Sequence, residues 1–455
     1  MKISIAKKEI SFNNLLIGLT FFIVVGVVFF IYSIDFSLLL LALLLFIYVQ
    51  FLRRLENLPS YLDLAILGAI AVLIPLLTTI TFKMPGYAIS AIGFVILITL
   101  LFDSLEFSFL FSIFISLLGA SIDGGNFNLG ISLFAGSLAA AMLSYRVRRR
   151  SQVIRAGLLA GIIQFGVAFI MEREQSFFVL SVPDFNLLKV CLLNGFLSGV
   201  IVSGFLPVFE HIFKVVTNIS LLELSDFNRP VLRKLILEAP GTYQHSLVVA
   251  NLSEAAAESI GANSLLARVG SYYHDIGKMI KPEYFVENLV SYKDVHKKLK
   301  PSMSKLIIVN HVKEGIELAK KHHLNPRIID FIPEHHGRSL VYYFYRRAKE
   351  LEPEGKHEEE YRYPGPKAQS KETAIVGLAD TVEALSRTLE EPTPARIEEM
   401  VREVVKKRFM EGELDESTLT LKDLEKITQS FIRILNAIFH TRVNYPKDES
   451  REKAK

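Results

Sequence analysis

The chain has 455 residues, of which 51% are hydrophobic, and its mean hydropathy is +0.34. This composition is too apolar for an ordinary soluble protein, and the length is sufficient for two domains. The formal net charge of +4 comes without a clustered basic patch, which argues against binding of a nucleic-acid polymer, and the single cysteine excludes an intramolecular disulfide.

The first half of the chain is a succession of apolar runs, each about as long as a membrane-crossing helix. Roughly 20 apolar residues are needed to cross a hydrocarbon core about 30 Å thick. The first run is long for a signal peptide, so we expect it to be retained as a helix. We therefore expect residues 1–213 to form a polytopic transmembrane bundle of about eight helices: 12–33, 36–52, 61–82, 85–102, 105–122, 127–145, 153–171 and 187–209.

Positive charges in the short loops predict the orientation of this bundle. Lysines and arginines gather before the first run, after the second, and between the sixth and seventh. With eight spans all three clusters lie on one side, which the positive-inside rule assigns to the cytoplasm. The protein is then a multi-pass protein of the plasma (inner) membrane, in contact with membrane lipid, and its C-terminal half is cytoplasmic.

The interior of the spans favours packing over transport. A transporter would need a buried series of ionisable residues, and the apolar runs contain none. Small residues on the last run favour close helix packing over a ligand site; they are Gly195, Ser198, Gly199, Ser203 and Gly204.

The composition becomes polar and charged after Phe213. Residues 214–230 have leucines spaced as in a short amphipathic linker helix, which Pro230 ends. From Val231 onward apolar residues recur at intervals of three and four, a pattern typical of helices and not of a sheet. We therefore predict an all-α protein, with a cytoplasmic helical domain over 231–443 and a charged, disordered tail over 444–455.

The second half also carries the chemistry, because all 11 histidines lie at or after His211. The adjacent His274 and Asp275 offer an imidazole and a carboxylate that can hold a divalent cation, and the carboxylate can bridge to a second ion. Gly277 permits a close backbone approach, and Lys278 adds a cation where a phosphate would sit. A His-Asp pair is common by chance, so this interpretation depends on the residues that accompany it.

Further ligand-type residues follow in predicted helices: His245, His311, His335, His336 and Asp380. Asp380 lies in an otherwise apolar helix, where metal coordination would remove the cost of burying a carboxylate. The remaining histidines lie in charged segments or at helix ends, where solvation explains them. Five imidazoles and two carboxylates suffice for two six-coordinate divalent ions, with Mn or Fe favoured over Zn or Ni. Such a pair activates water and clamps a phosphoryl oxygen, so we expect phosphoester hydrolysis.

Six motifs in this half carry a resemblance to a known family. They are Glu-Ala-Pro-Gly-Thr-Tyr-Gln-His-Ser (238–246), His-Asp-Ile-Gly-Lys (274–278), Asn-His-Val-Lys-Glu-Gly (310–315), Glu-His-His-Gly (334–337), Tyr-Arg-Tyr-Pro-Gly-Pro-Lys (361–367) and Leu-Ala-Asp-Thr-Val-Glu-Ala (378–384). In this order they resemble the HD-domain phosphohydrolases, and within them the seven-transmembrane HD family, over a stretch from about Phe36 to His440. Characterised members hydrolyse cyclic-di-AMP to pApA, and the resemblance implies that activity here.

The resemblance also implies roles for individual residues. His245, His274, Asp275 and Asp380 would hold one metal ion, and Asp275, His311, His335 and His336 the other. His274, Asp275 and Lys278 would be catalytic, with Lys278 meeting a substrate phosphate; an exposed lysine at a helix end is the alternative. Tyr363 and Lys367 would contact the nucleotide.

Two further segments bear on the substrate. The branch of the superfamily that acts on cyclic-di-GMP carries Gly-Tyr-Pro after its His-His pair, whereas residues 337–340 here read Gly-Arg-Ser-Leu, which argues against that substrate. The segment 342–372 is predicted to be the least regular part of the domain. Its aromatic and basic residues could stack on adenines and meet phosphates, or form a solvated excursion.

Other interpretations stay open. The family has a large extracellular domain between its first two helices, whereas only residues 33–36 join the first two runs here, so we expect that domain to be missing. The rivals to cyclic-di-AMP hydrolysis are an HD nucleotidase acting on another nucleotide and a non-catalytic membrane sensor that binds a cyclic dinucleotide, although a pure binder has no need of two metal ions. The oligomeric state is open, a homodimer included.

Overall fold

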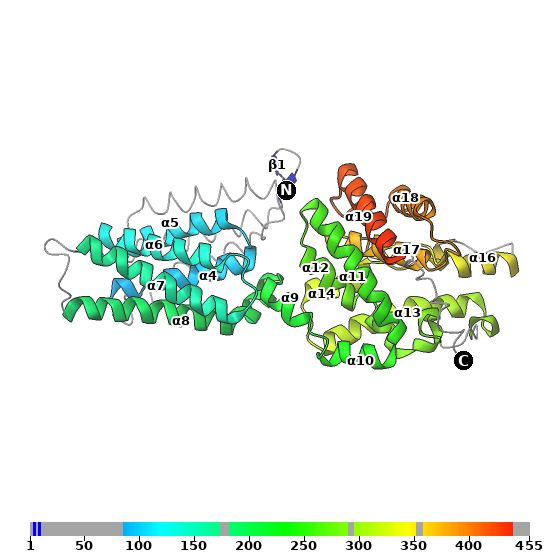
Figure 1. The fold of residues 1–455 in the computed structure, drawn as a ribbon, viewed down its shortest axis with the longest axis horizontal. Helices are drawn as coiled ribbons and strands as arrows, with labels where there is room; N and C mark the ends of the chain where they lie inside the picture. The colour runs from blue at the N-terminus through cyan, green and yellow to red at the C-terminus, as the bar shows by residue number, and fades with distance from the viewer. Residues whose placement is uncertain are drawn as a thin grey trace, which may run out of the picture. The chain divides into compact units, whose positions relative to one another are not determined.

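The computed structural model describes residues 3–5, 8–10, 85–172, 182–289, 295–351 and 358–439. The predicted spans 12–33, 36–52 and 61–82, the connection 33–36 and the tail 444–455 lie outside these residues. The chain forms two compact units, Met1–Ser220 and Leu221–Lys455, and the division falls within the predicted linker 214–230. Figure 1 shows the elements of both units as a ribbon.

The described elements are nearly all helical, as the sequence predicted. The exception is an antiparallel pair of short strands near the N-terminus, β1 (Ile3–Ile5) and β2 (Lys8–Ile10), in which Ile3 pairs with Ile10. Strands of three residues are too short to leave a readable alternation in the sequence, so the all-α prediction omitted them.

Four helices in the described part of the first unit are long and apolar enough to cross a membrane. Two of them, α5 (Leu105–Ile122) and α6 (Phe127–Ser144), have nearly the predicted bounds. The other two, α7 (Arg150–Glu172) and α8 (Val182–Phe213), are longer than the predicted 153–171 and 187–209. Neighbouring helices of this set pack side by side (Figure 1). The chain is therefore a multi-pass membrane protein.

The predicted span 85–102 is wrong as a single helix. The chain instead forms a 3-10 turn, η2 (Gly86–Ala88), followed by α4 (Ala91–Phe102), which has 12 residues. At 1.5 Å per residue, α4 is about 18 Å long and is too short to cross a hydrocarbon core of about 30 Å.

Side chains from neighbouring helices satisfy the backbone at this break. Asn194 on α8 donates from Nδ2 to the carbonyl oxygens of Tyr87 and Ile89, at 3.2 and 3.1 Å. Gln164 on α7 donates from Nε2 to the same Tyr87 oxygen at 3.1 Å. Irregular backbone at membrane depth is stable only where such partners replace the missing helical hydrogen bonds.

Glycines bring α7 and α8 into close contact. A Cβ on Gly195 would collide with the carbonyl oxygen of Gly157, and a Cβ on Gly157 with that of Gly195. Gly199 likewise faces the backbone of α7 at Ile154. By contrast, no atom of the described chain lies within 4 Å of the Cβ position of Gly204. The prediction of close packing is confirmed at Gly195 and Gly199, and the described residues show no such contact at Gly204.

The second unit is a set of helices joined by short 3-10 turns. Its α-helices, with α9 leading out of the first unit, are α9 (Asn218–Leu224), α10 (Pro230–Glu238), α11 (Pro240–Ile260), α12 (Ser264–Tyr273), α13 (Pro301–Lys321), α14 (Pro326–Ile329), α15 (Phe331–Glu334), α16 (Tyr342–Leu351), α17 (Lys371–Ser386), α18 (Pro394–Met410) and α19 (Leu421–Phe439). The 3-10 turns are η3 (Ile276–Ile280), η4 (Pro282–Tyr284), η5 (Val286–Asn288), η6 (Val295–Lys298) and η7 (Glu358–Tyr361). Many of the α-helices begin with proline, whose missing N–H costs nothing at that position.

Helix α17 is the centre of this unit. It packs against α11, α12, α18 and α19, and its residues from Thr373 to Val382 are almost all buried. A reciprocal pair of hydrogen bonds between Ser370 and Thr373 caps its N-terminus. The helix is thereby held rigidly where it carries Asp380.

The segment 342–372 is more regular than predicted. Its first ten residues form α16, and Phe344 and Ala348 on this helix pack with the buried Tyr361 of η7. Tyr342 and Tyr343 are 57% and 62% exposed. The aromatic residues predicted to stack on adenines therefore divide into a small core and an exposed pair.

Candidate metal centre

The seven predicted ligands come from five places in the second unit and meet in its interior. Their nitrogen and oxygen atoms form two groups, each within 4.8 Å, and Asp275 belongs to both. The groups are His245, His274, Asp275 and Asp380, and Asp275, His311, His335 and His336. The structure thus brings together residues up to 135 positions apart, such as His245 and Asp380.

The two oxygens of Asp275 face different groups. Oδ2 lies 3.2 Å from Nε2 of His274 and 3.7 Å from Nε2 of His245. Oδ1 lies 3.3 Å from Nε2 of His311 and 3.7 Å from Nε2 of His335. A carboxylate in this position can bridge two cations.

Asp380 lies on the other side of the same cluster. Its Oδ1 is 3.0 Å from Nε2 of His245 and 3.9 Å from Nε2 of His274. Its Oδ2 is 3.8 Å from Nδ1 of His336. The carboxylate of Asp380 therefore meets the first group directly and approaches the second.

Backbone carbonyls fix the orientation of three of the histidines. Nδ1 of His274, His311 and His335 lies 2.7, 2.5 and 2.9 Å from a carbonyl oxygen three or four residues earlier in the chain. Because a carbonyl oxygen only accepts, each Nδ1 carries a hydrogen and each Nε2 points to the centre, where it can hold a metal ion or a second proton. This is the usual arrangement of histidines that ligate metals.

His245 is fixed by a carboxylate. Its Nδ1 lies 2.5 Å from Oε2 of Glu383, whose side chain is buried. The other oxygen of Glu383 accepts from Arg387 at 2.5 Å. The sequence analysis missed this residue, although Glu383 lies three positions after Asp380, a spacing that places both on one face of α17.

His336 is held differently, by ring contacts. Its ring stacks on Tyr363 with centroids 4.1 Å apart and planes 26° apart, and it lies 3.8 Å from the ring of His335. Tyr363 is buried, and its backbone N–H donates to Ser339 at 3.0 Å, which fixes the stacked ring. The contact that Tyr363 makes in the described structure is thus with a predicted ligand.

The electrostatics of the cluster fit bound cations. Nε2 of His274, His311 and His335 is buried and makes no hydrogen bond within the described residues. Lone pairs facing carboxylate oxygens at 3.2–3.7 Å repel unless a positive charge lies between them. Two divalent ions would supply that charge, so the donor set and its orientation suit a binuclear site.

The pKa values of the imidazoles follow the same division. Burial lowers the pKa of His335 to about 3, and burial also lowers the pKa values of His311 and His336. These three are neutral at physiological pH, as ligands must be. Burial acts to lower the pKa of His274 as well, but Asp275 and Asp380 outweigh it and raise the pKa to about 10. In the metal-free protein, therefore, Nε2 of His274 carries a second proton and the imidazole is positively charged.

Lys278 forms ion pairs with two carboxylates. Its Nζ lies 2.6 Å from Oδ2 of Asp275 and 2.9 Å from Oε1 of Glu287, and its side chain is 13% exposed. The alternative of an exposed lysine at a helix end is therefore wrong. Nearby, Gly277 provides the close approach that its sequence position suggested, but to protein: a Cβ there would collide with the carbonyl oxygen of His311 on α13.

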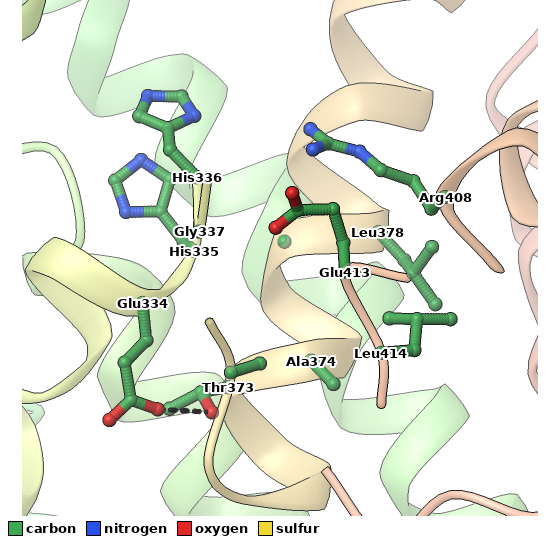
Figure 2. Close-up of a pocket in the computed structure, with 12 residues that line it drawn as sticks. Glu334, His335, His336, Gly337, Thr373, Ala374, Leu378, Arg408, Glu413 and Leu414 are labelled. Carbon is green, nitrogen blue, oxygen red and sulfur yellow. Dashed lines mark hydrogen bonds between the residues drawn. The ribbon is translucent and has the colours of Figure 1, made fainter. Parts of the chain in front are cut away.

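A pocket lies beside the turn that carries His335 and His336, and Figure 2 shows side chains from α17, from the end of α18 and from the loop after it lining the pocket. Among them are Arg408 and Glu413. Glu413 accepts a hydrogen bond from the backbone N–H of Arg338 at 2.9 Å and so holds this turn. The predicted contact Lys367 reaches the same loop, where its Nζ donates to the carbonyl of Gly412 at 2.8 Å. No motif marked Arg408 or Glu413 in the sequence.

Two families match the chain. Residues 29–217 match the family described as 7TM receptor with intracellular HD hydrolase. Residues 242–385 match the HD domain. The second match contains all seven predicted ligands.

Curated relatives are similar over both units. The chain is 38% identical over 374 residues to the cyclic-di-AMP phosphodiesterase PgpH of Bacillus subtilis, covering 81% of this chain and 52% of that protein. It is 40% identical over 347 residues to PgpH of Listeria monocytogenes, covering 76% and 48%. The chain thus spans about half the length of the curated relatives it matches.

A solved structure is similar to the second half. It is the HD domain of the L. monocytogenes phosphodiesterase PgpH in complex with cyclic-di-AMP, with 47% sequence identity, coverage of 47% of this chain and 100% of that one, and a TM-score of 0.46. The matches cover the membrane helices and the metal cluster alike. The chain belongs to the family of seven-transmembrane receptors with an intracellular HD hydrolase domain.

Proposed function

We propose that this chain is a two-metal phosphodiesterase that hydrolyses cyclic-di-AMP to pApA. The observation that carries the proposal is the position of Asp275, whose two oxygens face two separate groups of imidazoles at 3.2–3.7 Å. The overall identity to two proteins named as cyclic-di-AMP phosphodiesterases supports the choice of substrate.

The residues fit two divalent cations, and we infer Mn or Fe because the donors are nitrogen and oxygen without thiolate. His245, His274, Asp275 and Asp380 would hold one ion, and Asp275, His311, His335 and His336 the other. Bound there, the ions would supply a hydroxide near neutral pH and charge to stabilise a phosphoryl oxygen. The protein's own contribution is to hold the imidazoles as neutral, oriented ligands in a buried site.

Lys278 is better suited to orienting Asp275 than to meeting a substrate phosphate. Its ammonium group is shared between Asp275 and Glu287, so its positive charge is already compensated. A lysine in this position fixes which oxygen of Asp275 faces which imidazole. Tyr363 would likewise act first on His336, by stacking, with any contact to the nucleotide made from its edge.

We place the bundle in the plasma membrane and the HD domain in the cytoplasm, with lipid and cyclic-di-AMP as partners. The positive loops 146–150 and the family description both support this orientation. A non-catalytic cyclic-dinucleotide sensor is less well supported, because seven converging ligands serve no purpose in a pure binder.

The test uses the full chain in detergent micelles with Mn or Fe, given cyclic-di-AMP, cyclic-di-GMP and mononucleotides in separate reactions. We expect selective conversion of cyclic-di-AMP to pApA, resolved by chromatography. Turnover of mononucleotides alone would agree with the proposed metal site and contradict the proposal that cyclic-di-AMP is the substrate. Tight binding of a cyclic dinucleotide without turnover of any substrate would favour the sensor.

A further inference from the structure

Cationic side chains near the metal cluster include those of Lys278, Lys367 and Arg408, and the first two already have partners. Lys278 has carboxylate oxygens 2.6 and 2.9 Å from its Nζ. Lys367 donates to the Gly412 carbonyl at 2.8 Å and lies 3.7 Å from Oδ2 of Asp415. The charge of Lys278 is therefore compensated by two carboxylates, and the ammonium group of Lys367 is held at the loop after α18.

Arg408, the third cation, differs from both. It lies in the last turn of α18 and donates from Nη2 to Oγ1 of Thr381, at 2.8 Å. No carboxylate of the described residues forms an ion pair with it. Thr381 directly follows Asp380, so this hydrogen bond ties Arg408 to the part of α17 that carries a predicted ligand.

Arg408 also lies close to two predicted metal ligands. Together with His335, His336 and Glu413 it lines the pocket beside the metal cluster. In Figure 2 its side chain reaches from α18 across α17 toward the turn that carries the two histidines. Burial raises the pKa of Tyr363, and the positive charge of Arg408 opposes that rise. Tyr363 is the residue that stacks on His336.

We propose that Arg408 binds a phosphate group of the substrate at the His336 side of the metal cluster. A guanidinium group presents several N–H donors in a fixed plane that matches phosphate oxygens, and one hydrogen bond to Thr381 leaves most of these donors available. The inference rests on the proposed function, because it supposes a substrate that carries phosphate.

The test compares KM, kcat and the Kd for the product pApA in the Mn-loaded full chain. Arg408→Ala should raise KM and the Kd for pApA about tenfold or more, the loss expected for one charge-assisted hydrogen bond. Arg408→Lys should lose less, because it keeps the charge but not the planar donors. Bound manganese, measured by mass spectrometry, should be unchanged in both variants.

Two controls separate binding from packing. Thr381→Val removes the acceptor of the Arg408 hydrogen bond and leaves the guanidinium in place, so KM should stay within about twofold of the wild type. Arg402→Ala changes an arginine on the same helix that pairs with Glu398 and Glu425 on the surface, and it should leave KM unchanged.

The outcomes are distinguishable from failure of the proposed function. A wild-type chain that neither binds nor hydrolyses cyclic-di-AMP contradicts both. An active wild type with Arg408→Ala at the same KM and Kd contradicts this inference alone. Equal losses in Arg408→Ala and Thr381→Val would also overturn it, because the arginine would then act only by joining α18 to α17.

Discussion

His245 and Glu383 are 138 residues apart in the chain and meet in a hydrogen bond of 2.5 Å between Nδ1 and Oε2. The carboxylate is buried, and its second oxygen accepts from Arg387. This bond places the hydrogen of His245 on Nδ1 and turns Nε2 toward Asp380, 3.0 Å away. Carboxylates behind a ligating imidazole both orient it and increase its basicity.

Replacing this carboxylate should weaken metal binding without removing a ligand. We expect Glu383→Gln to lower metal affinity about 10- to 100-fold, the usual effect of losing such a partner. Competition with a fluorescent chelator measures the affinity. Glu390, an exposed residue shortly after α17, offers a matched control, since Glu390→Gln should leave metal affinity unchanged. Equal affinity in Glu383→Gln and wild type would contradict a role for the Glu383 charge in metal binding.

Metal binding should release protons. Burial opposes protonation of His274, but Asp275 and Asp380 raise its pKa to about 10, so in the metal-free protein it is protonated at pH 7.5. A metal ion needs the same lone pair, so the proton must leave and affinity should rise with pH up to about 10. Titration calorimetry in buffers of different ionisation enthalpy measures the protons released. A binding enthalpy independent of the buffer would contradict this account.

The close approach at Gly277 should make that position intolerant of a side chain. A Cβ there meets the backbone of α13 at His311 and Gly315, which cannot move aside as a flexible side chain can. Gly277→Ala should therefore lower the free energy of unfolding by roughly 1–3 kcal/mol, and it should reduce metal affinity because it separates Asp275 from His311. Thermal unfolding and chelator competition measure the two effects.

Gly315→Ala is the comparison for that variant. Its Cβ would meet Cγ2 of Ile332 at 2.9 Å and the backbone of Gly277 at 3.3 Å, so its overlap with backbone is much smaller than that of a Cβ on Gly277. We expect a smaller loss of stability and little change in metal affinity. If both variants behaved like the wild type, the packing of η3 on α13 would not position the site.

The contact between α7 and α8 gives a prediction for the membrane unit. Gly195→Leu should force these helices apart, because its side chain would overlap the backbone of Gly157. A Cβ on Gly204 of the same helix would meet no neighbouring described residue within 4 Å, so Gly204→Leu serves as the control. Thermal aggregation in detergent should begin at a lower temperature for Gly195→Leu only. The same temperature for both variants would contradict the packing.

The chemistry of the site was readable from the sequence because ligands are particular residue types. His274 and Asp275 are adjacent, and Asp380 is conspicuous as a carboxylate in an apolar helix. The sequence does not show which of these residues contact one another in the folded protein. Nothing in the chain near His245 points to Glu383 as its partner, and Arg408 becomes relevant only once α18 is placed against α17.

The fold, like the site, could be predicted from the sequence only in part. The apolar run from Gly86 to Phe102 predicts a continuous span, but the amides of Gln164 and Asn194, 77 and 107 residues after Tyr87, bond to its backbone where the helix breaks. Local composition predicts the bounds of α5 and α6 because Ser104 and Asn126, directly before the two runs, cap the helices. The sequence places Lys278 three residues after Asp275, but its second partner, Glu287, depends on tertiary structure.

The central claim is that two metal ions share Asp275 in an enzyme that hydrolyses cyclic-di-AMP. The most direct test measures bound manganese and conversion of cyclic-di-AMP to pApA in the same sample of the full chain. We predict two ions per chain with turnover in the wild type, and loss of both in the His274→Ala/Asp275→Ala double variant. Undiminished turnover in that variant, or turnover by a wild-type chain that holds no metal, would contradict the account.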